Sequence, residues 1–79
     1  MKNYHLTAVI WKEGRQYVSK CTELGVSSYG ASPEKAHSAL EEAVALYLSN
    51  AKKLGSLDDV KPALSSNTRY TAPLNIAAA

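Results

Sequence analysis

The sequence predicts an α+β fold in which one sheet packs on one long helix, in the element order β-β-β-α-β. Apolar residues recur every three or four positions over 33–54, which is the spacing of one face of an α-helix. Three short segments rich in β-branched and aromatic residues precede this stretch, and a further alternating segment follows it. At 79 residues the chain has room for one domain, so residues 1–79 are expected to form a single unit.

The three leading strands are expected over about 4–12, 15–21 and 25–30, in meander order. Gly14 lies in the short segment that would turn the chain between the first two strands. Alternation divides each strand into two faces. Because one helix covers only one face of a sheet, we expect the following residues of the first two strands to pack beneath it: Leu6, Ala8, Ile10, Tyr17, Ser19 and Cys21.

The helix is expected over about 33–54, with clear signals at both ends. Ser32 is a good N-cap, and Pro33 suits the first helical position, where no amide partner exists. Gly55 can take the left-handed conformation that closes a helix. The apolar stripe that must be covered is Ala36, Leu40, Ala43, Tyr47, Ala51 and Leu54.

The last strand is expected over about 69–76, after a polar connector that has no long helix. Tyr70, Ala72, Leu74 and Ile76 alternate on one face. Pro73 cannot donate to a ladder, so this strand belongs at an edge or carries an irregularity. The connector allows the strand to pair beside the first or third strand of its own sheet, or to cross to a neighbouring subunit.

Composition limits how so small a domain is stabilised. Cys21 is the single cysteine, which excludes an internal disulfide. His5 and His37 lie far apart without neighbouring ligands, so we expect no metal and no other cofactor. Self-association is left as the source of added stability, and a homo-oligomer is expected. A lone cysteine and the lack of a long apolar run predict a cytoplasmic protein without a membrane segment.

No residue pattern predicts catalysis, and the chain is expected not to be an enzyme. A nucleophile needs a base beside it, and Cys21 with His37 is the one conceivable pair. Cys21 is expected to pack under the helix and His37 to lie at the margin of the apolar stripe. Gly25 and Gly30 do not form a phosphate-binding loop, because no lysine follows them and the next helix begins with an acidic residue.

The sheet face away from the helix is the predicted binding surface. It would collect Val9, Trp11, Val18 and Tyr29, and aromatic anchors among aliphatic residues are typical of protein interfaces. Tyr70 and Leu74 of the last strand are expected to contribute to the same oligomer or partner contact. An alternative is an RNA platform of these aromatics with Lys12, Arg15 and Lys20, although a net charge of +2 with scattered basic residues is a weak signal for nucleic acid.

The residue order over about 4–54 resembles the HicB-type antitoxins of bacterial toxin–antitoxin pairs. In that family a tyrosine-containing second strand leads to a Pro-Glu-Leu turn, and a Gly-acidic-Thr-x-Glu-Glu-Ala sequence opens the helix. This chain retains six of those positions and departs from the pattern at Thr22, Ala31 and Lys35. The retained residues are Tyr17, Glu23, Leu24, Gly30, Glu34 and Ala36. The segment 69–76 looks like the closing strand of short family members.

The resemblance implies a partial RNase H-like or double-stranded-RNA-binding-like fold that forms dimers or higher oligomers. It also implies a partner, a small basic HicA-type toxin that cleaves RNA and is neutralised when the antitoxin covers its active site. Many members carry a C-terminal DNA-binding segment, whereas only 24 residues follow Gly55 here, so no DNA binding is expected. The expected function is that of a HicB-like antitoxin. The alternatives are an orphan homo-oligomer of unknown cellular role and an RNA-binding module.

Overall fold

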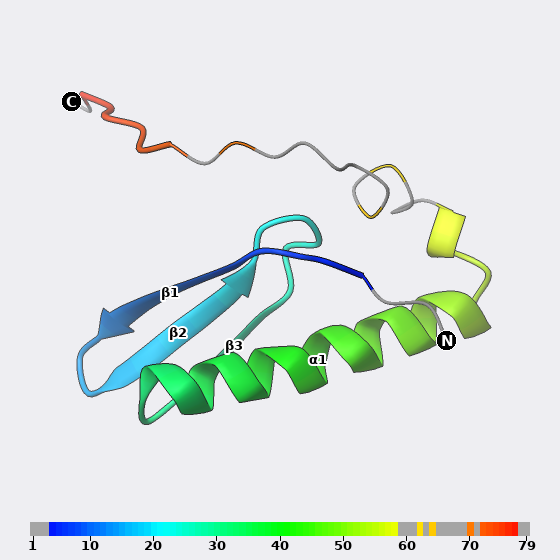
Figure 1. Cartoon of the computed structure of the whole chain (residues 1–79), viewed down its shortest axis with the longest axis horizontal. Coiled ribbons are helices and arrows are strands. Elements are labelled where there is room, and N and C mark those ends of the chain that lie inside the picture. The colour runs from blue at the N-terminus through cyan, green and yellow to red at the C-terminus, as the bar shows by residue number, and fades with distance from the viewer. Residues whose placement is uncertain (1–3, 59–61, 63, 65–69, 71, 78–79) are drawn as a thin grey trace.

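Three strands and one long helix are the main elements in the computed structural model, which describes residues 4–58, 62, 64, 70 and 72–77. The strands are β1 (Ala8–Glu13), β2 (Gln16–Cys21) and β3 (Ser27–Gly30), and the helix is α1 (Pro33–Lys53). The strands form one antiparallel sheet in the order β1-β2-β3. The helix crosses one face of this sheet (Figure 1). Among the described residues the fold is therefore α+β, with one sheet on one helix.

Strands β1 and β3 begin later than the sequence pattern predicts, because their leading residues make other hydrogen bonds. The Thr7 N–H donates to Glu23 Oε1 at 2.8 Å instead of to the backbone of the neighbouring strand. Before β3, the Cys21 N–H donates to the Val26 carbonyl and the Gly25 N–H to the Cys21 carbonyl, which makes a tight turn. Alternating composition alone does not show these local turn bonds.

The helix begins and ends at the predicted signals. Ser32 has extended backbone angles and its hydroxyl accepts the Lys35 N–H at 3.1 Å. At the other end Gly55 has φ of 74°, and its N–H donates to the Lys52 carbonyl. Lys52 and Lys53 lie in the last turn, where cations suit the negative end of the helix dipole.

The buried core of the described residues is built mostly from small side chains. Cys21, Ala36, Leu40 and Ala51 are the buried apolar residues, and Ser19 is the buried polar one. Ala8 lies opposite Cys21 and Ile10 opposite Ser19 in the β1–β2 register, so both share the helix-facing side of the sheet. The predicted assignment of inner and outer faces agrees with this register.

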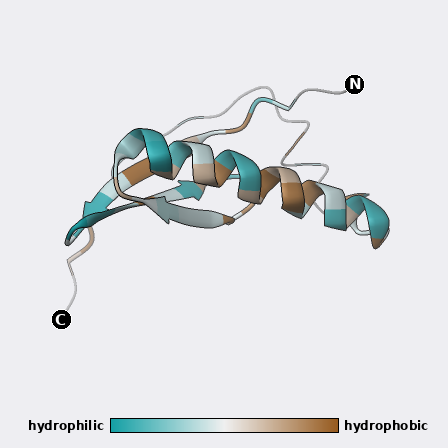
Figure 2. Cartoon of the chain, turned by 90° about the horizontal axis from the view of Figure 1, so that it is seen from below, coloured by the Kyte–Doolittle hydropathy of each residue, from teal (hydrophilic) through white to brown (hydrophobic). Residues whose placement is uncertain are grey.

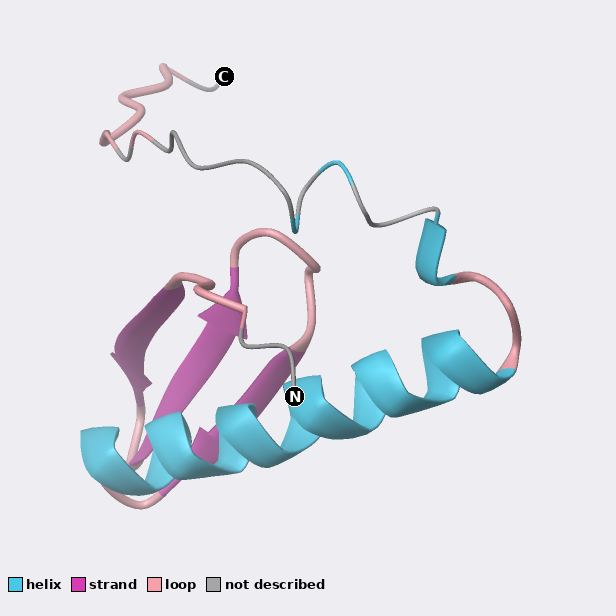
Figure 3. Ribbon diagram, turned by 45° about the vertical axis from the view of Figure 1, so that its right-hand side comes forward, coloured by secondary structure: helices cyan, strands magenta, loops and turns pink. Residues whose placement is uncertain are grey.

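The helix is longer than the sheet it covers. Its 21 residues span about 31 Å, whereas a six-residue strand spans about 20 Å. The second half of α1 therefore extends past the strands and carries much of the helix's hydrophobic surface (Figures 2 and 3). Tyr47 and Leu54 were expected to be covered as part of the apolar stripe, but both are exposed, whereas Ala51 of the same stripe is buried.

The described part of the last predicted strand is not a strand. Residues 70 and 72–76 have no regular secondary structure, and residues 69 and 71 lie outside the described residues. The large apolar side chains of this segment are exposed: Tyr70, Leu74 and Ile76. The alternation of apolar residues predicted a strand here. A strand also needs a neighbouring strand for its backbone hydrogen bonds, and the described residues of the single chain do not provide one.

Candidate protein-binding face

A row of three large side chains crosses the sheet on the side away from the helix. Trp11 on β1 lies opposite Val18 on β2, and Val18 lies opposite Tyr29 on β3. Residues directly opposite one another in antiparallel strands point to the same face, with their Cβ atoms about 4.5–5.5 Å apart. The structure therefore brings together three residues that are up to 18 positions apart in the sequence.

This row is open to solvent in the single chain. Trp11 exposes 39% of its surface and Tyr29 67%, while Val18 between them is half-buried. Val9 lies on the same face two residues from Trp11 and is also exposed. We call Val9, Trp11, Val18 and Tyr29 the outer face. An open depression lies beside the outer face, and Val18 and Tyr29 are among the residues that line it.

The outer face carries little charge. Lys20 lies opposite Val9 in the register and is the basic residue of the strands on this side. Lys12 projects to the other side, where its Nζ atom lies 5.9 Å from the centroid of the Tyr17 ring. Glu13 accepts a hydrogen bond from Trp11 Nε1 at 3.1 Å, which fixes the indole edge and places a carboxylate beside it. Of the three basic residues in the RNA alternative, Lys20 is thus on the side of Trp11 and Lys12 is on the other side.

Tyr70 and Leu74, also predicted as interface residues, are not part of this face. They belong to no strand and expose 91% and 85% of their surface. The predicted interface thus divides into two separate sets, the outer face and an apolar C-terminal segment.

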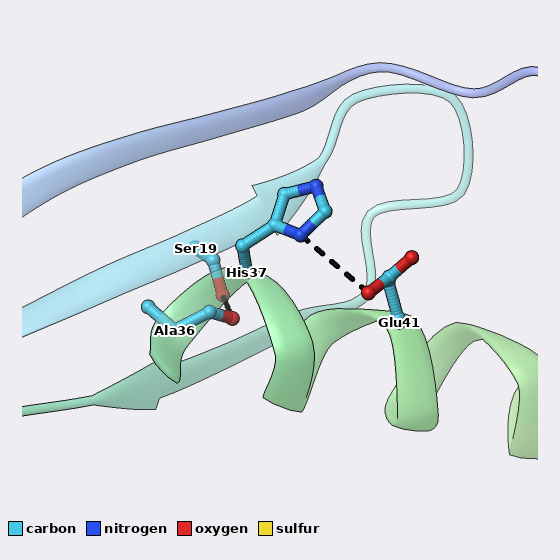
Figure 4. A network of polar contacts seen from close by, with 4 residues as sticks. All are labelled: Ser19, Ala36, His37 and Glu41. Carbon is cyan, nitrogen blue, oxygen red and sulfur yellow. Dashed lines mark hydrogen bonds and ion pairs between the residues drawn. The ribbon is translucent and has the colours of Figure 1, made fainter. Parts of the chain in front are cut away.

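The conceivable nucleophile and base are engaged with different carboxylates. The buried Cys21 thiol donates to Glu23 Oε1 at 3.6 Å. His37 Nδ1 lies 3.5 Å from Glu41 Oε1, and both of these side chains are exposed (Figure 4). Cys21 and His37 line the same groove beside α1, but among the described residues their polar contacts go to Glu23 and Glu41 and not to each other.

Metal ligands do not gather anywhere in the part of the chain that is described. None of its His, Cys, Asp and Glu residues form a group of three or more that could hold an ion. A search of the same residues for a helix long and apolar enough to cross a membrane finds none.

Glu23 is the residue of structural importance that the sequence pattern did not reveal. Its burial would raise the pKa, but hydrogen bonds from Thr7, from its own N–H and from Thr22 outweigh burial and lower the pKa to about 2. The carboxylate joins the β2–β3 turn to the residue that precedes β1. In the sequence, the one sign of this role is that Glu23 is an acidic residue next to Leu24 in a short turn.

No protein-family model, curated protein or solved structure matches this chain. The structure by itself defines a class: a small α+β unit whose sheet is covered by a helix on one face and exposes an aromatic row on the other.

Proposed function

We propose that this chain is a protein-binding module of the HicB-like antitoxin type, which acts through the outer face. Its partner would be a small basic HicA-type toxin, neutralised by contact rather than by catalysis. The cross-strand row of Trp11, Val18 and Tyr29 is the observation that carries the proposal. The resemblance over residues 4–54, with its retained Glu23 and Gly30, supplies the kind of partner and the proposed partial RNase H-like or double-stranded-RNA-binding-like fold.

The physical basis is the cost of leaving such a row in water. Burying a large apolar side chain contributes about 1.5–3 kcal/mol to binding. A row of three neighbouring large side chains is suited to the centre of a protein interface. Trp11 is also pre-oriented by its hydrogen bond to Glu13, so binding would cost less side-chain entropy. The Glu13 carboxylate beside the indole suits a basic partner, and a toxin that binds RNA is expected to be basic.

The test is neutralisation and direct binding of a HicA-type protein, which is first sought among the proteins encoded beside the gene of this chain. Co-expression should restore growth of cells that produce the toxin, and the purified proteins should form a stoichiometric complex. Replacing Trp11 with Ala should weaken the complex by about 30-fold or more, as expected for a central aromatic anchor. Tyr47→Ala is the matched control, because it truncates an aromatic residue of similar exposure, 37%, on the helix. It should change affinity by less than about threefold, which is the size expected of a residue outside the interface.

Three results would contradict the proposal. Equal effects of Trp11→Ala and Tyr47→Ala, with both variants folded, would remove the outer face from the interface. A chain that neither binds nor neutralises the toxin would fit the orphan homo-oligomer. Binding of oligonucleotides at low salt that weakens steeply as salt rises would fit the RNA-binding module.

A further inference from the structure

An open apolar groove lies on the helix side of the sheet, away from the outer face. It has a volume of about 320 Å³ and runs between the segment that leads into β1 and the middle of α1. Its apolar lining includes Leu6 and Ala8 on one side and Leu40, Val44 and Leu48 on the other, and the polar side chains of His37 and Glu41 also line it on the helix side. The groove exists because α1 lies over β2 and β3 and leaves β1 partly uncovered, so Ala8 is exposed although it faces the helix.

The free edge of β1 forms the rim of this groove. The Thr22 N–H donates to the Thr7 carbonyl, so Thr7 directs its backbone groups toward β2. Backbone direction alternates along a strand, and therefore the N–H and C=O groups of Ala8 and Ile10 point away from β2. In the three-stranded sheet that is described, β1 is an edge, and these groups are available to another strand.

The C-terminal segment has the properties of such a strand. Tyr70, Ala72, Leu74 and Ile76 alternate with other residues and would form one apolar face. Its large side chains are almost fully exposed in the single chain. The same molecule thus presents an uncovered apolar groove with a free strand edge, and an uncovered apolar segment with strand periodicity.

We propose that residues 70–77 of one copy add to the β1 edge of a second copy as an antiparallel strand, with Leu74 and Tyr70 in the groove. By two-fold symmetry each chain would fill the groove of the other. This concerns a different surface from the outer face and does not depend on the proposed toxin partner.

Pro73 determines the strand direction. In an antiparallel pair, residues opposite Ala8 and Ile10 share both their face and their hydrogen-bonding side. The groove-facing residues Tyr70, Ala72, Leu74 and Ile76 would then make the ladder bonds, and Pro73 would point outward, where its missing N–H costs nothing. In a parallel pair with the same apolar face inward, the alternate residues make the bonds, and Pro73 would leave a gap in the ladder.

The same argument favours a second copy over the chain's own segment. Strand β3 is parallel to β1, and two residues connect its end to α1, so α1 runs back toward the end of the sheet where β1 begins. The C-terminus of α1 extends past that end (Figure 1). A segment that returned directly from there would enter the position beside β1 parallel to it, which is the direction that Pro73 disfavours.

The test is the dimer dissociation constant of the full chain, measured by analytical ultracentrifugation. Leu74→Asp should weaken the dimer by about 100-fold or more, because an aliphatic burial is lost twice in a two-fold dimer. Asn75→Asp adds the same charge at the neighbouring, outward position and should change the constant by less than about threefold. Both variants should keep the helical circular dichroism of the native chain. Equal loss of the dimer in both variants, or no loss in Leu74→Asp, would overturn the proposal.

The source of the strand is read from isotope-filtered NOE spectra of mixed ¹³C-labelled and unlabelled chains. Contacts between the Ala8 methyl and the Leu74 methyls across differently labelled chains are the expected result. The same contacts seen only within uniformly labelled chains would assign the groove to the chain's own segment and overturn the exchange. A monomer at all concentrations would overturn it as well.

Discussion

Replacing Glu23 with Gln removes the charge from the carboxylate that joins the β2–β3 turn to Thr7. Gln keeps one oxygen to accept the Thr7 N–H, now 2.8 Å from Glu23 Oε1. Its NH₂ group would take the place of the other oxygen, which is buried, and would bring a donor into a site supplied with donors. We expect the variant to fold with a lower free energy of unfolding.

The magnitude follows from the pKa of Glu23. Its value falls from 4.5 to about 2 on folding. Each unit corresponds to 1.36 kcal/mol, which gives about 3 kcal/mol, and solvent screening at this partly exposed site lowers the expectation to about 2–3 kcal/mol. Because the folded pKa is depressed, this stability is present above pH 4.5 and is lost as the pH falls from 4.5 toward 2. It is a large fraction of what so small a domain can have.

Urea unfolding followed by circular dichroism, at one fixed protein concentration, measures this effect at pH 7, 5, 4 and 3. The gap between native chain and Glu23→Gln should be about 2–3 kcal/mol at pH 7 and should shrink by more than half by pH 3. Glu42→Gln is the control, because Glu42 is an exposed helix residue. A gap that stays constant with pH would refute the charge argument, and the absence of a gap at pH 7 would refute the role of Glu23.

Two further predictions concern the contact between helix and sheet. Gly30→Ala should lower the free energy of unfolding by about 1–3 kcal/mol, because a Cβ at this position would lie 2.6 Å from the Ala36 nitrogen. In the same urea titration the control Ser28→Ala, on the same strand, should have little effect. Ser19→Ala should lower the free energy of unfolding by about 1 kcal/mol, because the buried hydroxyl donates to the Ala36 carbonyl at 2.8 Å (Figure 4). A urea midpoint equal to that of the native chain would contradict this prediction.

The sequence predicted best those features that local chemistry decides. The Ser32 cap, the Pro33 start and the Gly55 stop bound the helix at both ends, and the observed α1 ends one residue before the predicted position. The inner and outer faces of the strands followed from alternation, which has only two possible outcomes once one face must be covered.

Features that depend on tertiary partners were not predictable in this way. The helix stripe is periodic to its end, but Tyr47 and Leu54 are exposed where α1 extends past the sheet, while Ala51 between them is buried. The segment over 69–76 has strand periodicity without a ladder among its described residues. The roles of Glu23 and Ser19 each depend on an atom 16 or 17 positions away, Thr7 and Ala36 respectively, and no local pattern encodes those pairs.

Trp11 gives this protein an optical probe at the surface of greatest interest. It is the single tryptophan of the sequence, its indole edge is held by Glu13, and a large part of it is in contact with water. Excitation of tryptophan in the unlabelled chain therefore reports on one place alone. A blue shift of the emission on adding a partner would signal burial of the outer face. A strand added at the β1 edge would also lie beside Trp11, so the spectrum of the chain alone, recorded as a function of its concentration, gives the baseline against which the partner's effect is measured.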